Sequence, residues 1–286
     1  MTRERLFSFI GVTVTVLFLV AASASHALAD DNATTCKGGS IASGVYSNLK
    51  IAGTCTVDKG SVTVEGDLTV LPGATLIAVT GGLDGFGGPS LSSDLTVGGN
   101  LDVQAGGVMT LGCEPVYYTC PNDPAFAVNG PGTFLTQHTV AGNLTAENAL
   151  GVVIHHTNVL GNVVVRGGGG GVSCATFLPA LGAPPYADFE NMAIGGNLTI
   201  TGWQSCWLGW FRDTVGRNVD FNGNVTADPD GNEVQNNTVV GNLNCSGNNP
   251  TPQVGDSGGG PSTVLGNVNG QCNKPTLVRP GGNKGE

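Results

Sequence analysis

A short motif, V-x-G-N-L, recurs along this chain and restricts its fold more than any other feature. Aligned on its Asn, or on the Asp that replaces it once, the motif occurs nine times, at Asp67, Asn100, Asn143, Asn162, Asn197, Asn218, Asn224, Asn242 and Asn267. A related stretch upstream contains Asn48. Several of the spacings are 18 to 21 residues, and the longer gaps hold glycine-, proline- or cysteine-bearing stretches. A repeat of about 20 residues with insertions is typical of solenoid proteins.

The residues that flank the motif favour strands, because they alternate apolar and polar and are rich in Val, Ile and Thr. A leucine-rich repeat has a similar length, but its L-x-x-L-x-L-x-x-N pattern is absent. A hexapeptide helix needs consecutive six-residue steps, and only Asn218 to Asn224 provides one. The sequence therefore predicts an all-β protein, a single-stranded parallel β-helix with rungs of about 20 residues, loop insertions and disulfides.

Each part of the motif has a physical interpretation. The apolar residues three before and one after the Asn are expected to point into the solenoid, where each contributes roughly 1.5–3 kcal/mol on burial. We expect the Gly and Asn to form a corner between two strands, because both tolerate positive φ. Stacked Asn amides could also hydrogen-bond from rung to rung as a ladder.

The corner motif, the step G-A-T-L at 73–76 and the ending N-T-V-V-G-N-L-N-C resemble secreted bacterial parallel β-helix repeat proteins of uncharacterised function. A more distant resemblance is to bactofilin-type β-helices. The resemblance extends over about residues 40–272 and implies an architecture but no activity. Bactofilins are cytosolic and lack disulfides, so the export signal and cysteines described below disfavour a cytoskeletal role.

The N-terminus has the form of a secretory signal peptide. Arg3 and Arg5 precede an apolar run, and Ala27-Leu28-Ala29 is a small-x-small cleavage site. The alternative is an uncleaved membrane anchor. We expect a signal peptide at 1–29, a β-helix domain at 30–272 and a flexible C-terminal tail at 273–286. The protein would then be secreted or at the cell surface, with no stable membrane span after cleavage.

The charge of the expected mature chain excludes some partners. It carries nine basic and twenty acidic residues, a formal charge of −11. Binding to nucleic acid requires a basic surface, and an anionic membrane attracts one. Both partners are therefore disfavoured, which leaves cell-wall or extracellular polysaccharide as the partner to consider.

All eight cysteines follow the signal, and an even number in an exported chain indicates disulfides. Zinc binding is the alternative, but it usually requires closely spaced pairs with histidine nearby. Cys36 and Cys55 are 19 residues apart, about one rung, so they could stack on neighbouring rungs within disulfide reach. We expect neighbours to pair: Cys36–Cys55, Cys113–Cys120, Cys174–Cys206 and Cys245–Cys272.

Four regions depart from the repeat and are expected to be insertions, near 81–94, 112–133, 167–190 and 202–213. The last contains Trp203, Trp207 and Trp210, whose spacing suits one side of a helical turn. These tryptophans could form a carbohydrate-binding platform. The favoured alternative is a short helix that packs its aromatic side onto the solenoid.

Two further groups could bind metal or transfer protons. Asp228, Asp230, Asn232 and Glu233 surround a glycine turn with oxygen ligands that suit calcium, although a solvated turn is the favoured interpretation. No other cofactor is expected. The histidines that precede corner motifs, His138, His155 and His156, are expected to be polar surface residues, since adjacent strand residues face opposite sides.

Catalysis has little support in the sequence. Polysaccharide-cleaving β-helices need clustered carboxylates, or a basic residue with calcium, on one wall. Here Asp94, Asp102, Asp213 and Asp220 are scattered singly, and G-D-S-G-G-G at 255–260 is interpreted as a linker loop. The first hypothesis is a non-enzymatic structural or adhesion-type scaffold. The alternative is a carbohydrate-binding or polysaccharide-degrading β-helix, which a carboxylate cluster beside the tryptophans would favour.

Overall fold

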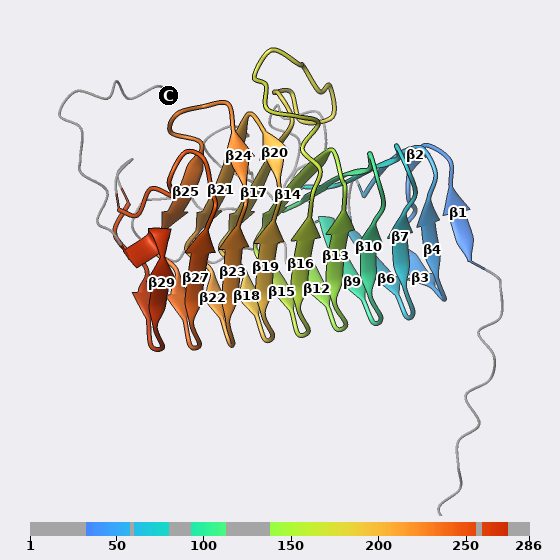
Figure 1. Cartoon of the computed structure of the whole chain (residues 1–286). Coiled ribbons are helices and arrows are strands. Elements are labelled where there is room, and N and C mark those ends of the chain that lie inside the picture. Colours follow the sequence, from blue (N-terminus) through green and yellow to red (C-terminus); the bar gives the residue numbers. More distant parts are fainter. Residues whose placement is uncertain (1–32, 58–59, 80–92, 113–137, 256–258, 274–286) are drawn as a thin grey trace, which may run out of the picture. The chain divides into compact units, whose positions relative to one another are not determined.

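The chain forms a three-sided parallel β-helix (Figure 1). The computed structural model describes residues 33–57, 60–79, 93–112, 138–255 and 259–273. Successive strands belong in turn to three sheets, here named A, B and C, and all pairings between their named strands are parallel. Within each sheet, neighbouring strands come from successive coils, so the predicted solenoid is confirmed.

Sheet A is ten-stranded and lies nearest the viewer in Figure 1. Its register aligns the residue that follows the motif Asn in every coil, as in Leu101 opposite Leu144. In order, its strands are β1 (Thr34–Cys36), β4 (Leu49–Ile51), β7 (Leu68–Val70), β10 (Leu101–Val103), β13 (Leu144–Glu147), β16 (Val163–Arg166), β19 (Leu198–Thr201), β23 (Val219–Asn222), β27 (Leu243–Ser246) and β29 (Val268–Gly270).

Sheet B is eight-stranded and supplies the second side of each coil. Its strands are β2 (Gly39–Ser40), β5 (Thr54–Thr56), β8 (Thr75–Ala78), β11 (Val108–Leu111), β14 (Gly151–His155), β17 (Tyr186–Glu190), β21 (Trp207–Phe211) and β25 (Asn232–Gln235). A separate pair, β20 (Gln204–Ser205) and β24 (Val225–Thr226), lies between sheets A and B in chain order.

Sheet C is nine-stranded and contains the apolar residue that precedes the motif Asn by three. Its strands are β3 (Gly44–Tyr46), β6 (Gly60–Val64), β9 (Ser93–Val97), β12 (His138–Val140), β15 (Thr157–Val159), β18 (Ala193–Ile194), β22 (Thr214–Val215), β26 (Thr238–Val239) and β28 (Thr263–Val264).

The core is one continuous apolar column inside the three sheets. Both apolar positions of the motif point into it, as predicted: Val97 and Leu101 are buried, and so are their equivalents in the neighbouring coils. Burial of such side chains contributes roughly 1.5–3 kcal/mol each. Stability therefore accumulates coil by coil, as expected for a solenoid.

The motif asparagines form the predicted ladder along the corner between sheets C and A. Each side-chain Oδ1 accepts the backbone N–H of the equivalent residue in the next coil, with N···Oδ1 distances of 2.7–3.1 Å. From Asn100 onward each Nδ2 also donates to the Oδ1 before it. The ladder contains Asn48, Asp67, Asn100, Asn143, Asn162, Asn197, Asn218, Asn242 and Asn267.

One residue assigned to this corner belongs elsewhere. Asn224 is buried after β23, where its Oδ1 accepts the N–H of Trp203 and its own N–H donates to Asn248. The short six-residue step from Asn218 to Asn224 is therefore a step between two corners of one coil, rather than between coils.

The predicted reason for the motif glycine was wrong at the ladder corner. There, neither the Gly nor the Asn of the motif has positive φ in the described coils, whereas Gly223, in the copy around the misassigned Asn224, has φ 66°. A Cβ at Gly142 would instead lie 2.6 Å from Asn100 Oδ1, and one at Gly241 would lie 2.6 Å from Asn218 Oδ1. The motif needs glycine because the coils approach each other closely at the ladder.

Positive φ occurs at the other two corners. Between sheets A and B it is found at Asn148 and at glycines such as Gly202, directly after the strands of sheet A. Between sheets B and C it is found at His156, Asn191, Arg212 and Asn236, which stack on one another in successive coils. Gly adopts this conformation readily, and Asn and His do so more often than other residues, whereas Arg does so rarely.

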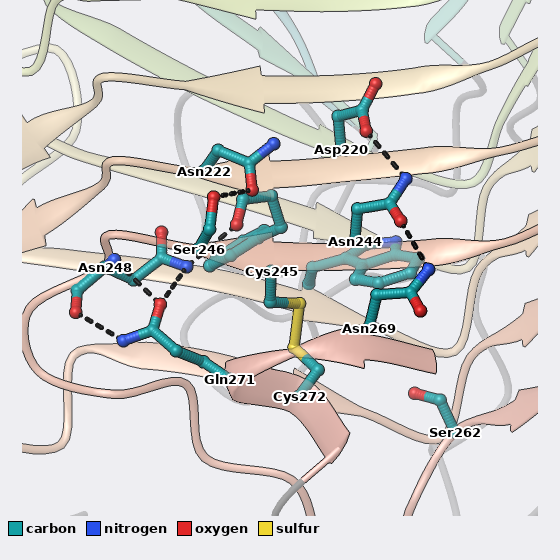
Figure 2. The surroundings of a disulfide bond; sticks show 12 residues. Asp220, Asn222, Asn244, Cys245, Ser246, Asn248, Ser262, Asn269, Gln271 and Cys272 are labelled. Atoms are coloured by element: carbon teal, nitrogen blue, oxygen red, sulfur yellow. Dashed lines mark hydrogen bonds between the residues drawn. A yellow bond between two sulfur atoms is a disulfide. The ribbon is translucent and has the colours of Figure 1, made fainter. Parts of the chain in front are cut away.

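Three disulfides follow the predicted pairing: Cys36–Cys55, Cys174–Cys206 and Cys245–Cys272. Cys113 and Cys120 lie outside the described residues. Figure 2 shows Cys245–Cys272 at the last coil, beside outward amide contacts between Asp220, Asn244 and Asn269. The disulfides are consistent with folding in an oxidising compartment outside the cytosol.

Helix is almost absent from the described residues, which contain only a 3-10 turn, Gln271–Asn273. The predicted helix in 202–213 was wrong, and that range is not an insertion, because Trp207–Phe211 is the regular strand β21 of sheet B. Likewise the region 167–190 ends in the regular strand β17. No helix in this part of the chain has the length and apolarity to cross a membrane.

Candidate functional site on the outer face of sheet B

The central outward rows of sheets A and C contain no aromatic residue in the described strands. The row of sheet C is largely threonine: Val45, Thr63, Thr96, Thr139, Asn158, Ala193, Thr214, Thr238 and Thr263. The matching row of sheet A is more mixed and includes charged residues: Thr35, Lys50, Thr69, Asp102, Thr145, Val164, Thr199, Asp220, Asn244 and Asn269. Neither row offers an aromatic surface.

The outer face of sheet B is different. Strands β14, β17, β21 and β25 alternate inward apolar residues, such as Ile154, Phe189 and Trp210, with outward polar or aromatic ones. We call the outward set the B face; it consists of His155, Tyr186, Asp188, Glu190, Trp207, Phe211, Glu233 and Gln235.

A charged cluster occupies one side of the B face, formed by His155, Asp188, Glu190 and Arg212. His155 and Glu190 are register partners on β14 and β17, and Asp188 precedes Glu190 by two residues on the same side of the strand. His155 Nε2 lies 3.2 Å from Asp188 Oδ2. Arg212 Nη2 pairs with Glu190 Oε2. The fold thus brings together groups from three consecutive coils.

The cluster is buried although it lies on an outward face. His155 is 2% exposed, Asp188 5% and Glu190 7%. Buried ionised groups are costly unless paired, and the two pairs within the cluster provide that compensation. Arg212 reaches Glu190 from the positive-φ corner, where its Nε also donates to Asn191 Oδ1 at 3.1 Å.

The neighbouring His156 responds to the same charges. Burial, together with smaller contributions from the nearby His155, Arg212 and His138, lowers the pKa of His156 to about 3. Its side chain is therefore neutral at physiological pH, and no positive charge is added beside Arg212.

An aromatic strip of Tyr186, Trp207 and Phe211 adjoins the charged cluster. The rings of Trp207 and Phe211 stack with centroids 5.8 Å apart and planes at 18°, and Tyr186 meets Trp207 edge to face at 6.1 Å. Trp207 Nε1 donates to Glu233 Oε1 at 3.3 Å, and Gln235 Nε2 donates to Glu233 Oε2 at 3.1 Å. Phe211 is the register partner of Glu190, so the strip and the cluster are contiguous.

The loop before β17 borders this surface. Cys174–Cys206 ties the loop to the segment before β21. Leu181 packs with Val108 and Val153, which are outward residues of β11 and β14. The loop therefore covers outward residues of β11 and β14, and its apolar cluster extends to Tyr186 at the edge of the aromatic strip.

The three tryptophans predicted to share one platform are separated by the fold. Trp203 and Trp210 are fully buried in the core, and Trp203 Nε1 donates to Ser205 Oγ at 2.7 Å. Trp207 alone of the three faces outward, because it lies an odd number of residues from Trp210 on the same strand.

The surface placement expected for the histidines was also wrong. His138 and His155 are buried, and His156 is half-buried. His138 lies inside the solenoid, where its ring nitrogens contact the backbone N–H groups of Leu95 and Gly112 at 3.2 and 2.9 Å. The sequence pattern beside the corner does not reveal that His138 points inward, nor that the outward His155 is covered.

The four candidate calcium ligands do not converge. Asn232 is buried and donates to the Pro250 carbonyl at 2.8 Å, whereas Glu233 lies on the opposite side of β25 and accepts from Trp207. Asp228 Oδ1 accepts the N–H of Asp230 at 2.9 Å in the preceding turn. The arrangement is that of a turn between coils, the interpretation favoured from the sequence.

Asp188 and Glu190 were not identified as functional candidates in the sequence, and Glu233 was considered only as a calcium ligand. Of the described residues, His155, Asp188 and Glu190 form the group whose ligand atoms all lie within 4.8 Å of one another, close enough to hold one metal ion. No family model matches the chain, and neither a curated protein nor a solved structure matches it.

Proposed function

We propose that this protein is an exported adhesion-type solenoid that binds polysaccharide along its B face. The observation that carries the proposal is the asymmetry of the solenoid walls. The central outward rows of sheets A and C hold no aromatic residue in the described strands, whereas sheet B has three aromatic rings beside carboxylates, of which Tyr186 and Trp207 are half-buried and Phe211 is buried. Fold alone implies no function, so the argument depends on this surface.

The chemistry of the B face suits a sugar chain. Sugar rings have apolar C–H faces and hydroxyl edges, so they combine well with an aromatic side chain and nearby carboxylate or amide groups. Trp207 and Glu233 are half-buried and lie beside each other, with Trp207 Nε1 donating to Glu233 Oε1, while the buried Gln235 holds the other carboxylate oxygen in place. A rigid wall also positions these groups without an ordering cost on binding.

The scaffold role is part of the same proposal. The asparagine ladder and the disulfides give a rigid rod, and the formal charge disfavours nucleic acid and anionic lipid as partners. The signal-like N-terminus and the disulfides support secretion or surface attachment as part of the proposal.

The test is binding of the oxidised full chain to a panel of immobilised plant, microbial and host polysaccharides. Trp207→Ala is expected to weaken binding at least tenfold. Phe177→Ala is the matched control, because Phe177 is an exposed aromatic residue of the loop before β17; it is expected to bind like the wild type. Absence of binding to every polysaccharide at millimolar repeat-unit concentration, or an equal effect of both substitutions, would overturn the proposal.

A further inference from the structure

We propose that His155, Asp188 and Glu190 bind one divalent transition-metal ion on the B face. The inference does not depend on carbohydrate binding. It follows from the types of the donor atoms, the distances between them, their burial and their charge.

The register of sheet B fixes the three donors on one side of the wall. His155 and Glu190 lie opposite each other on adjacent strands, and Asp188 is the next outward residue of β17. Because the strands are held on both sides, by β11 and β21, the donors cannot separate without disrupting the sheet. A site on regular strands is better preorganised than one on loops.

The distances suit a shared ion. Ligand atoms about 2.0–2.2 Å from a metal lie roughly 3–3.6 Å from one another in tetrahedral or octahedral geometry. His155 Nε2 and Asp188 Oδ2 are already 3.2 Å apart, and the Glu190 oxygen lies within 4.8 Å of both. Small side-chain rotations would complete the set.

The burial and charge of the cluster favour a cation. With a neutral imidazole, Asp188, Glu190 and Arg212 leave a formal charge of −1 in a region where all three donors are at least nine-tenths buried. His155 Nδ1 is also buried and has no hydrogen-bond partner in the described part of the chain. A divalent cation would offset the remaining negative charge.

Arg212 does not exclude the ion. A carboxylate has two oxygens and about four acceptor positions, so a guanidinium and a metal can bind Glu190 together. Partners of this kind orient a metal-binding carboxylate in many sites. Arg212 approaches from the corner side of the strand, whereas His155 and Asp188 approach from the preceding coil and the same strand.

The donor types select the class of metal. Imidazole nitrogen suits zinc, manganese, iron, nickel or copper, whereas calcium and magnesium prefer oxygen ligands alone. Three protein ligands leave coordination positions for water or for a ligand oxygen, which distinguishes the site from a closed structural zinc site.

Zinc is the test case. The oxidised full chain, purified without a histidine tag and stripped with a chelator, is expected to bind one equivalent of Zn²⁺ by calorimetry. Added zinc is also expected to raise the unfolding temperature. Co²⁺ in its place should give a visible absorption band that reports the coordination.

Asp188→Asn and Glu190→Gln keep side-chain shape and are each expected to weaken zinc binding at least tenfold. Glu147→Gln is the matched control, because Glu147 is an exposed carboxylate on sheet A, 3.5 Å from Arg166; it should leave the affinity unchanged. If stripped wild-type protein binds neither ion at millimolar concentration, the cluster is a pair of ion pairs and the proposal is wrong. Binding that survives both substitutions in folded protein would equally overturn it.

Discussion

Asn218 Nδ2 lies 3.5 Å from Asn197 Oδ1, the longest side-chain contact in the asparagine ladder, whose other Nδ2···Oδ1 distances are 3.0–3.3 Å. The backbone N–H contact between the same two residues is also the longest, at 3.1 Å. This is the coil in which Arg217 replaces the motif glycine. The Cβ of Arg217 thus accompanies a ladder that is wider by a few tenths of an ångström but unbroken.

Arg217 shows how the ladder responds to a side chain at the motif glycine position, so it indicates what an alanine at another motif glycine would do. In Gly241→Ala the new Cβ would start 2.6 Å from Asn218 Oδ1 and 2.7 Å from the carbonyl carbon and oxygen of Arg217, so the neighbouring coils must move apart slightly, as they do at Arg217. We expect the free energy of unfolding to fall by about 1 kcal/mol, since weakened hydrogen bonds are partly offset by the lower unfolded-state entropy of alanine. Chemical denaturation of the oxidised protein measures this change.

The control is Arg217→Ala, which keeps the existing Cβ and removes only an exposed side chain. It should change stability by less than about 0.5 kcal/mol. A loss above about 4 kcal/mol for Gly241→Ala would mean that the coils cannot separate, and that the tolerance at Arg217 is local.

Asp213 lies inside the corner between sheets B and C, outside the asparagine ladder. Its Oδ1 accepts the N–H of Met192 in the preceding coil at 2.7 Å, as a ladder Oδ1 accepts an N–H from a neighbouring coil. Burial raises the pKa of Asp213 well above its usual value. Trp210 lies near enough to lower that pKa slightly, yet no hydrogen bond of normal geometry reaches Oδ2. In the next coil Asn237 accepts the Asp213 N–H and donates Nδ2 to the Trp210 carbonyl at 2.9 Å.

We therefore expect Asp213→Asn to stabilise the protein by about 1–3 kcal/mol at pH 7. The new amide would face the carbonyl of Phe189, the register partner of Trp210. Because a raised carboxyl pKa removes stability as pH rises above the unfolded value, the gain should be small at pH 4 and larger at pH 7. Unfolding curves at both pH values measure it; a gain independent of pH would contradict the role of ionisation.

The coil-to-coil repeat could be predicted because its two apolar positions and its Asn recur at fixed offsets. The reason for the glycine could not, because the distance between neighbouring coils is a property of the stacked structure. From one coil alone, a glycine beside an asparagine indicates positive φ as readily as close approach. Asn224 was misassigned for a similar reason, since two different corners of the coil contain the same short sequence.

The charged cluster was missed because the repeat was aligned only on the corner motif. In the coils from β14 to β25, the residue four positions before the inward Val or Ile of sheet C lies in one outward row of sheet B. This row contains His155, Glu190, Phe211 and Gln235. Alignment on this row would have predicted their proximity. Their burial could not have been predicted, because it depends on what lies over the sheet rather than on alternation along the strand.

His138 makes stability depend on pH in the acidic range. Burial lowers the pKa of His138 to about 4, with smaller opposing effects from Asp94 and the Ala78 carbonyl. Below the ordinary pKa of 6.5 the unfolded chain binds a proton that the folded chain does not, so stability falls as pH drops from about 6.5 to 4. The full loss is on the order of 3 kcal/mol.

The measurement compares the pH dependence of unfolding in Asp213→Asn, where the opposing carboxyl group is absent, with that in Asp213→Asn/His138→Gln. The loss of stability between pH 7 and 4 should be smaller in the double variant. Equal slopes in the two proteins would show that the folded chain accepts the proton on His138.

The three disulfides differ in their exposure to solvent, and we expect the most exposed one to be reduced first. Cys174 is exposed and Cys206 half-buried, whereas Cys245 and Cys272 are 1% and 7% exposed. Thiol–disulfide exchange requires the attacking thiolate to reach a sulfur atom, so a mild reductant should open Cys174–Cys206 first and Cys245–Cys272 last, with Cys36–Cys55 between them. Timed alkylation followed by peptide mapping gives the order.

The control is the same reduction in denaturant, where the three rates should converge because burial no longer protects any sulfur. If the rates in the native protein were already equal, the last coil would open as readily as the loop before β17.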